Sequence, residues 1–333
     1  MSNRLIIILL FALSLGSCEK TWIEKNIEKS SQEILTELWT EVDENYVFFD
    51  QKSIDWNDSF SNHFNSLTGS ETDEELFDIL ASLISDLKDG HSSLYAGFNT
   101  WKYYDLYLNT PSNYNQNFVE STYLGTPSTI GPFTYSILND NIAYIHYASF
   151  GDNFSEDELQ YLFDFMNTSS TGLILDLRNN QGGALDNALG LMSVFVENDE
   201  TVGEIYYPKL DGRLDEGTNL TVSPNKNGTY YENKTVLLTN RKSYSACSVF
   251  TGFMKGKENI TIVGDTTGGG SGLAAATVLS NGWQYRYSAG KITLPNGEEM
   301  ENGVAPDEYV STGTADELNG EDALIERALE ILN

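Results

Sequence analysis

The first third of the chain carries apolar residues at the spacing of an amphipathic helix. The positions that recur with helical spacing are Ile34, Leu35, Leu38, Trp39, Val42 and Tyr46. Thr72 precedes Glu75 by three positions, which is the spacing of a capping box, and an apolar stripe follows to Leu87. We expect that helix to end near Asp89–Gly90, where glycine favours a left-handed turn. These patterns predict an N-terminal helical subdomain over residues 31–95.

The pattern changes at residue 141, where short apolar runs begin to alternate with helical stretches. Runs typical of strands cover 141–150, 173–177, 234–240 and 260–265. Helical stretches cover 155–166, 184–196 and 245–255, and a last helix is expected over 316–332. Two Asn-Gly dipeptides within 277–297 indicate hairpins. This alternation predicts an α/β core over residues 141–333 with a largely parallel sheet.

The stretch between these two regions has a different composition. Residues 96–140 are rich in Tyr, Asn, Thr and Pro and show no strong period. We interpret them as an irregular connecting region, with short strands as the alternative.

The charge of the chain limits its partners. The sequence holds 19 basic and 49 acidic residues, a formal net charge of −30. Such a surface repels phosphate backbones, so we expect no nucleic-acid partner. It also disfavours very acidic substrates, although a local site can differ from the average.

The N-terminal residues have the pattern of an export signal. Arg4 is followed by an apolar run too short to span a bilayer, and Leu15-Gly16-Ser17-Cys18 resembles the bacterial lipobox. We therefore expect residues 1–17 to be a lipoprotein signal peptide, Cys18 to be lipidated and residues 18–30 to form a tether. An ordinary signal peptide with a chance cysteine is the alternative. With Cys18 modified, Cys247 has no partner, so we expect no disulfide framework. The same pattern predicts an exported bacterial lipoprotein on the periplasmic or cell-surface face of the envelope.

A strand-to-helix turn near residue 245 could carry a nucleophile. The sequence "TNRKSYSACSVFTGFMK" leads from a buried-looking strand into a helix. Backbone N–H groups at such a turn stabilise a developing oxyanion, and a serine there can attack a carbonyl. From these residues alone the choice among Ser243, Ser245, Cys247 and Ser248 stays open. The alternative is a serine that only caps the helix.

Other segments carry groups that would complete such a site. The sequence "LRNNQGG" at 177–183 places two glycines after a strand, and "GDTTGGGSG" at 264–272 is a second glycine-rich loop. His91 lies in a small polar segment suited to a general base, whereas His63 and His146 read as structural. The acidic run at 298–301 offers carboxylates to orient an imidazole. Three scattered histidines and no HExxH motif predict no metal.

Five motifs in order resemble one family. They are "LKDGHS", "LDLRNNQGG", "NRKSYSA", "VGDTTGGG" and "GVAPD". Together they are similar to the C-terminal-processing, or tail-specific, serine peptidases and to the catalytic core of tricorn protease, over residues 31–312. The resemblance implies a crotonase-like spiral ββα core behind the helical subdomain. No segment resembles the PDZ module that family members often carry.

The resemblance also implies roles for individual residues. Ser245 matches the nucleophile, and the N–H groups of Ala246 and of Gly182 or Gly183 match the oxyanion hole. The processing branch places a lysine base 25 positions later, but Gly270 stands there. In the tricorn-like branch, His91 and Glu301 match the base and its orienting acid, with Glu299 as a rival.

One position departs from the tricorn-like pattern. That branch has a serine directly before the histidine, and here the residue is Gly90. Ser92 is the candidate to replace it.

The resemblance therefore implies a serine endopeptidase that acts on peptide or protein substrates without a cofactor. The chain would meet the membrane through its lipid anchor only, and its oligomeric state is not indicated. The alternatives are a non-catalytic peptide-binding lipoprotein on the same scaffold and a hydrolase of a non-protein ester or cyclic peptide.

Overall fold

The computed structural model describes residues 29–103, 110, 113–138, 141–198, 200–208, 218–225 and 228–333. The expected signal peptide, Cys18 and most of the tether lie outside the described residues. Within the described part, no helix combines the length and the apolar character that crossing a bilayer requires.

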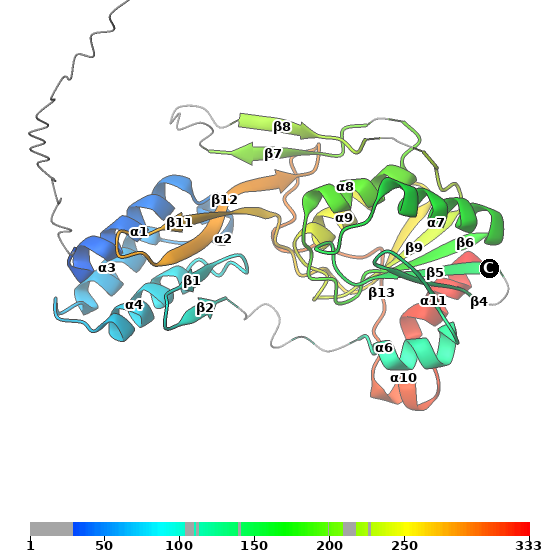
Figure 1. Ribbon diagram of the computed structural model, residues 1–333, viewed down its shortest axis with the longest axis horizontal. Coiled ribbons are helices and arrows are strands. Elements are labelled where there is room, and N and C mark those ends of the chain that lie inside the picture. Colours follow the sequence, from blue (N-terminus) through cyan, green and yellow to red (C-terminus); the bar gives the residue numbers. More distant parts are fainter. Residues whose placement is uncertain are drawn as a thin grey trace, which may run out of the picture.

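A seven-stranded sheet forms the larger part of the molecule (Figure 1). In spatial order its strands are β13 (Glu308–Tyr309), β10 (Ile260–Gly264), β9 (Lys234–Thr239), β6 (Gly172–Asp176), β5 (Ile142–Tyr147), β4 (Phe133–Leu138) and β3 (Ser128–Ile130). The strands from β13 to β5 are parallel, and β4 and β3 add antiparallel pairs at one edge. The largely parallel sheet that the sequence predicts is therefore present.

Helices cover both faces of this sheet, which explains why its central strands are continuously apolar. On one face lie α7 (Glu156–Ser169), α8 (Leu185–Met192) with the 3₁₀ turn η2 (Ser193–Phe195), and α9 (Ala246–Met254). On the other lie α11 (Ala323–Leu332) and the short segments α6 (Gln116–Val119), η1 (Glu120–Leu124) and α10 (Thr314–Leu318). Leu173 and Leu175 enter the first cluster and Ile174 enters the second, as strand alternation requires.

The N-terminal helices form a second core together with a distant hairpin. The elements are α1 (Ser31–Asn45), α2 (Phe49–Lys52), α3 (Trp56–Ser66), α4 (Asp73–Ser85), β1 (Ser93–Tyr95), β2 (Thr100–Lys102), β11 (Gly272–Val278) and β12 (Gln284–Thr293). Trp283, Tyr285 and Tyr287 of the hairpin are buried in one cluster with the helices. The helical subdomain at 31–95 thus completes its core with residues from the far end of the chain.

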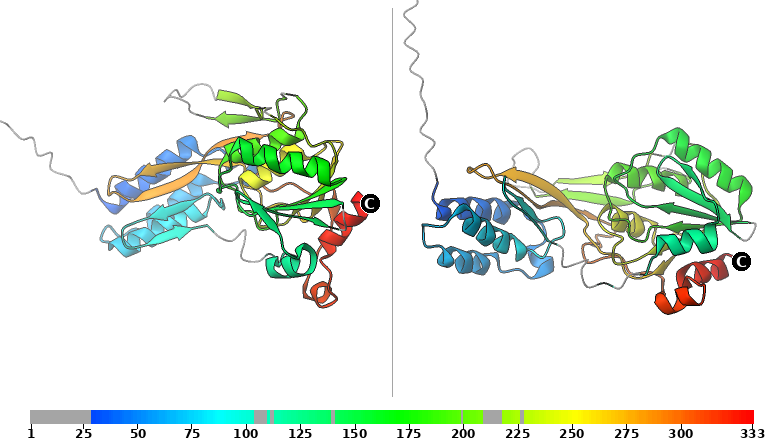
Figure 2. Two further views of the ribbon diagram at one scale, coloured as in Figure 1. Left: turned by 45° about the vertical axis from the view of Figure 1, so that its right-hand side comes forward. Right: turned by 60° about the horizontal axis from the view of Figure 1, so that its bottom comes forward.

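Strand β12 joins the two parts of the molecule. One end pairs with β1, and the other pairs with β7 (Gly203–Tyr207), which pairs in turn with β8 (Thr218–Val222). Figure 2 shows the N-terminal helices and the larger sheet at opposite ends of an elongated molecule, with β12 running between them.

The α/β architecture with an N-terminal helical part is confirmed, and the capping boxes at Thr72–Glu75 and Ser155–Glu158 both form. Three boundaries differ from the expectation. Helix α4 ends at Ser85, and the left-handed residue that follows is Lys88, with φ 46°, rather than Gly90. The expected last helix is split into α10 and α11, and the connecting region contributes β3 and β4 to the large sheet.

Candidate active site

Three loops meet at one edge of the large sheet. They follow β6, β9 and β10, which are adjacent parallel strands, so their carboxyl ends lie together. The N–H of Tyr244 donates to the carbonyl of Asn180 at 2.9 Å, and the N–H of Ser245 donates to the carbonyl of Gly269 at 2.8 Å. The strand order thus brings together the glycine-rich loops and the turn that the sequence separates.

Ser245 lies on a sharp turn between β9 and α9. Its backbone has φ 55° and ψ −124°, a left-handed conformation that costs a non-glycine residue about 1–3 kcal/mol. Such strain at a strand-to-helix turn projects a hydroxyl from the end of the sheet. Its side chain makes no capping hydrogen bond to the helix, so the helix-cap alternative does not describe this serine.

The other three candidate nucleophiles are held inside the fold. Ser243 Oγ donates to the carbonyl of Leu177 at 2.8 Å, and Ser248 Oγ donates to the carbonyl of Ser243 at 3.0 Å. Cys247 is fully buried, and burial raises the pKa of its thiol well above the ordinary value. These contacts give the three residues structural tasks.

His91 reaches Ser245 from the other part of the molecule. It lies between α4 and β1, and its Nε2 is 3.0 Å from Ser245 Oγ, although 154 positions separate the two residues. The ring of Tyr244 lies beside the imidazole, with 5.2 Å between ring centroids. Both His91 and Ser245 line a cleft of about 400 Å³.

The other two histidines have different neighbours. His63 Nε2 lies 3.1 Å from Asp86 Oδ2, and His146 is buried with its ring against Tyr114. Only His91, of the three, contacts a candidate nucleophile in the described structure.

The carboxylate nearest to the His91 ring belongs to Asp89. Asp89 Oδ1 accepts the backbone N–H of His91 at 2.8 Å and lies 3.8 Å from its Nδ1. Asp89 is fully buried, and no described atom hydrogen-bonds to His91 Nδ1. Burial lowers the pKa of His91, Asp89 opposes that shift, and the positive charges of Arg286 and Lys52 add to it. A lowered pKa favours the neutral imidazole at pH 7, which is the form that a general base requires.

Glu301 does not make the contact with His91 that the resemblance implies. Its Oε1 binds Lys52 Nζ at 2.8 Å, and both side chains are largely buried. Burial and the neighbouring Asp89 raise the pKa of Glu301 to about 7, against the attraction of Lys52. Lys52 comes from α2, so the helical part supplies a cation to the acidic pair behind His91.

Neither of the two alternates, Glu299 and Ser92, hydrogen-bonds to the imidazole among the described residues. Glu299 pairs with Lys291, and no hydrogen bond links it to His91 among the described residues. Ser92 is buried, and its hydroxyl has no hydrogen-bond partner in the part of the chain that the structure describes.

Two backbone N–H groups near Ser245 have no partner among the described residues, and they belong to Gly183 and Ala246. The third expected donor is engaged, because the N–H of Gly182 donates to Asn180 Oδ1 at 2.9 Å. Gly183 lines the cleft, and Ala246 is the first residue of α9, where the helix dipole favours negative charge. An oxyanion would therefore be held by Gly183 and Ala246, while Gly182 shapes the loop.

Gly182 cannot be replaced without moving the turn. It has φ 86°, and a Cβ there would lie 2.5 Å from the carbonyl oxygen of Tyr244 and 2.8 Å from the N of Ala246. We expect Gly182→Ala to lower kcat/KM at least about 100-fold, because small displacements of positioned groups are that costly. Steady-state kinetics would measure this, with Gly97→Ala as the control, since its Cβ would meet no atom within 4 Å. Unchanged kinetics in Gly182→Ala would contradict this view of the turn.

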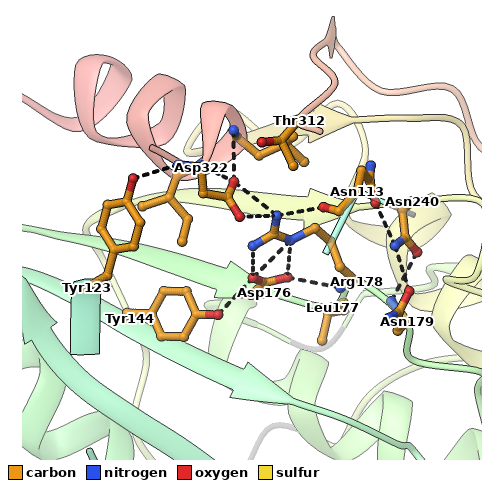
Figure 3. A network of polar contacts seen from close by, with 12 residues as sticks. Asn113, Tyr123, Tyr144, Asp176, Leu177, Arg178, Asn179, Asn240, Thr312 and Asp322 are labelled. Atoms are coloured by element: carbon orange, nitrogen blue, oxygen red, sulfur yellow. Dashed lines mark hydrogen bonds and ion pairs between the residues drawn. The ribbon is translucent and has the colours of Figure 1, made fainter. Parts of the chain in front are cut away.

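A buried polar network holds the two loops in place (Figure 3). Arg178 is fully buried and binds Asp176 Oδ2 at 2.6 Å, Asp322 Oδ2 at 2.8 Å and the carbonyl of Asn113 at 2.9 Å. Burial alone would raise the pKa of Asp176, but Arg178 outweighs it and keeps the carboxyl ionised. The network ties the loop after β6 to the start of α11.

Asn240 extends this network to the nucleophile turn. Its side-chain amide donates to Asn113 Oδ1 at 2.8 Å and to Asn179 Oδ1 at 2.9 Å, and its backbone N–H donates to Ser243 Oγ at 3.0 Å. The loop that offers Gly183 and the turn that carries Ser245 therefore share one rigid support.

The ring of Tyr244 occupies the space next to Gly270, where the processing branch has its lysine. Gly270 has φ 79°, and a Cβ there would lie 2.3 Å from the ring of Tyr244. The same ring lies beside His91. The site is therefore built for an imidazole, and a lysine at 270 would collide with the residue that packs against it.

The sequence did not indicate that three further residues, Asp89, Lys52 and Arg178, contribute to the candidate active site. Asp89 stands two residues before His91, and that spacing was the available signal. Arg178 and Asp176 interrupt an otherwise apolar run, which indicates a buried ion pair. Lys52 has no local signal, because its partner is 249 positions away in the chain (301 − 52). In the part of the chain that the structure describes, no cluster of His, Cys, Asp and Glu could hold a metal.

Comparison with known proteins also indicates a serine peptidase. The model of Peptidase family S41 matches residues 141–310, and that of the Tricorn protease C1 domain matches residues 27–85. A CtpA-like serine protease of Staphylococcus haemolyticus is 27% identical over 174 residues, which cover 52% of this chain and 34% of that protein. A CtpA-like serine protease of Staphylococcus epidermidis is 32% identical over 148 residues, covering 44% and 29%. The chain thus spans about a third of the length of these relatives.

Solved structures match nearly the whole chain. A peptidase from Parabacteroides merdae superposes with a TM-score of 0.83 at 32% identity, covering 91% of this chain and 97% of that one. The photosystem II D1 C-terminal processing protease shares the fold at 16% identity, with a TM-score of 0.58, covering 85% and 94%. Since the S41 model matches just over half of the sequence and the P. merdae peptidase matches almost all of it, this chain belongs to peptidase family S41, a family of serine peptidases.

Proposed function

We propose that the chain is a serine endopeptidase that cleaves peptide bonds through an acyl-enzyme on Ser245. The observation that carries the proposal is the 3.0 Å separation of His91 Nε2 and Ser245 Oγ at a strained turn on a cleft. An imidazole at that distance can take the hydroxyl proton as the oxygen attacks.

The proposed reaction has two halves. Ser245 Oγ bonds to the peptide carbonyl carbon while His91 Nε2 takes its proton, and the N–H groups of Gly183 and Ala246 hold the oxyanion. The intermediate then breaks the C–N bond, and His91 returns the proton to the leaving amine. Water repeats the sequence on the ester, with His91 again as base, and restores Ser245. Each oxyanion donor contributes about 3–4 kcal/mol to the lowering of the barrier.

We assign the orienting role to the buried acidic pair behind His91. Asp89 lies closer to Nδ1 and stabilises the imidazolium that forms in the transition state. Glu301, held by Lys52, is the second carboxyl group of this pair. This proposal shifts the orienting task from Glu301 to Asp89 and retains Glu301 as its support.

The test is hydrolysis of a library of internally quenched peptides by the chain without residues 1–17. We expect cleavage at internal bonds, with products identified by mass spectrometry, and no cleavage by the matched Ser245→Ala chain. Cleavage that persists in Ser245→Ala, or none by a well-folded wild-type chain, would reject the proposal and favour a non-catalytic binder.

The pKa of His91 sets the expected pH dependence. Because neutral His91 is the base, kcat/KM should fall on acidification, and the fall should centre below the ordinary histidine pKa of about 6.5, since burial lowers it. Asp89→Asn removes the charge that opposes this shift, so its acidic limb should move to lower pH while kcat also falls. A limb unchanged in Asp89→Asn, or a flat profile from pH 5 to 8, would contradict these assignments.

We further propose that the chain is exported and lipid-anchored at Cys18. The support is the residue order at 15–18 behind a short apolar run. Cells grown with an alkyne-labelled fatty acid should yield labelled wild-type protein and unlabelled Cys18→Ala, with Cys247→Ala as the control. Equal labelling of Cys18→Ala and the wild type would overturn this proposal.

A further inference from the structure

The cleft beside Ser245 is lined by two cations that come from one row of a sheet. Strand β1 pairs Ser93 with Lys102 of β2 on one side and with Arg286 of β12 on the other. Residues paired in this way point to the same face of a sheet, and neighbouring strands lie about 4.8 Å apart. The Cα atoms of Lys102 and Arg286 are therefore about 10 Å apart across Ser93.

The opposite face of these strands packs against the N-terminal helices. Leu94 and Tyr285, the next residues along β1 and β12, are buried among the helices. Lys102 and Arg286 are exposed and line the cleft together with His91 and Ser245. The register of the sheet thus fixes which side chains the cleft receives.

Neither cation has an acidic partner among the described residues. Lys102 lies over the ring of Tyr95, 5.9 Å from its centroid, and the guanidinium of Arg286 makes no ion pair or side-chain hydrogen bond with the described residues. Among the described residues, no Asp or Glu lines the cleft. The cleft is therefore locally positive in a chain with a net charge of −30, and salt screens the remote acidic residues beyond about 8–10 Å.

The positive charge lies close to the reacting groups. Arg286 is among the charges that lower the pKa of His91, and it lines the same cleft as Ser245. A negative group on a bound peptide would meet both cations while the scissile carbonyl approaches Ser245. Guanidinium and ammonium groups bind a carboxylate through short, charge-assisted hydrogen bonds.

We propose that Lys102 and Arg286 form a carboxylate subsite, so that the enzyme prefers peptides with a carboxylate near the cleaved bond. The carboxylate is supplied by an Asp or Glu side chain or by the C-terminus of the substrate. The inference rests on the proposed peptidase function and names the substrate class of that same site. It also refines the expectation from net charge, because the local charge of the cleft opposes the average.

The test compares matched quenched peptides built on one cleaved sequence. One pair differs by Glu against Gln near the cleaved bond, and a second pair differs by a free C-terminal acid against an amide. We expect the wild-type chain without residues 1–17 to favour the carboxylate member of one pair about tenfold in kcat/KM, and the responding pair identifies the source. Lys102→Gln and Arg286→Gln should each lose most of that preference, measured as the ratio of kcat/KM within each pair, so that any change common to both members cancels.

Lys234→Gln is the matched control, because Lys234 is an exposed cation at the start of β9 outside the cleft. A second readout does not need catalysis: the same peptides are titrated into the Ser245→Ala chain by fluorescence anisotropy. Binding preference without hydrolysis would support the subsite and reject the proposed function. Hydrolysis without any preference in either pair, or a preference that both Gln variants retain, would overturn the subsite and leave the peptidase proposal standing.

Discussion

Replacing Ser245 with Ala is expected to lower kcat by about 10⁴- to 10⁶-fold, because no other serine or cysteine of the described residues hydrogen-bonds to the His91 ring. His91→Ala should cost nearly as much, and the double variant should be no worse than either alone, since the two groups act in one proton transfer. Single-turnover and steady-state kinetics on one peptide measure all three. KM should change little, because neither side chain supplies most of the substrate contacts.

The matched control lies two residues further along the chain, in the first turn of α9. Cys247→Ala removes a buried thiol with a raised pKa and should keep most of the activity. Loss of activity in Cys247→Ala with retention in Ser245→Ala would reverse the assignment of the nucleophile. Additive losses in the double variant would show that Ser245 and His91 do not work together.

Arg178→Met is expected to lower the free energy of unfolding by about 3–5 kcal/mol, the usual cost of breaking a buried ion network from one side. The substitution leaves the carboxylates of Asp176 and Asp322 buried without their cation. It also removes the donor to the carbonyl of Asn113. Urea denaturation at pH 7 measures the effect, and both active-site loops should lose order with it.

Arg327→Met is the control for this prediction. Arg327 of α11 pairs with Glu308 of β13 and with Glu330 of α11, but its side chain is 38% exposed. Solvent screens such pairs, so the change should be much smaller than for Arg178→Met. Equal effects of the two substitutions would contradict the structural role given to the network in Figure 3.

The helices and strands could be predicted from the sequence because local chemistry determines them. Continuous apolar runs predicted the central strands, since both faces of a covered sheet are buried. The capping boxes at Thr72 and Ser155 predicted where two helices begin, and both form. Helix α4 ends at Ser85, the backbone continues through tighter turns with hydrogen bonds three residues back, and Lys88 then adopts a left-handed conformation that helix propensity does not assign to lysine.

The candidate active site could be predicted from the sequence only in part. The order of five motifs predicted that His91 and Ser245 belong together, and the structure brings them within 3.0 Å. Their meeting depends on where β1 pairs with β12, a contact between segments almost 200 residues apart that no local pattern encodes. The Lys52–Glu301 pair depends on the same docking of the helical part. Asp89 precedes His91 by two positions, and its burial became evident only from the packing.

The most direct test of the central claim is the site of covalent labelling by a fluorophosphonate. Such a probe reacts with a serine only when a neighbouring base activates it in a site that stabilises the oxyanion. The wild-type chain without residues 1–17 is treated at pH 7.5, digested and mapped by mass spectrometry. We expect one adduct, on Ser245, that is absent from a folded His91→Ala chain; an unlabelled wild-type chain, or an adduct on any other residue, would contradict the account.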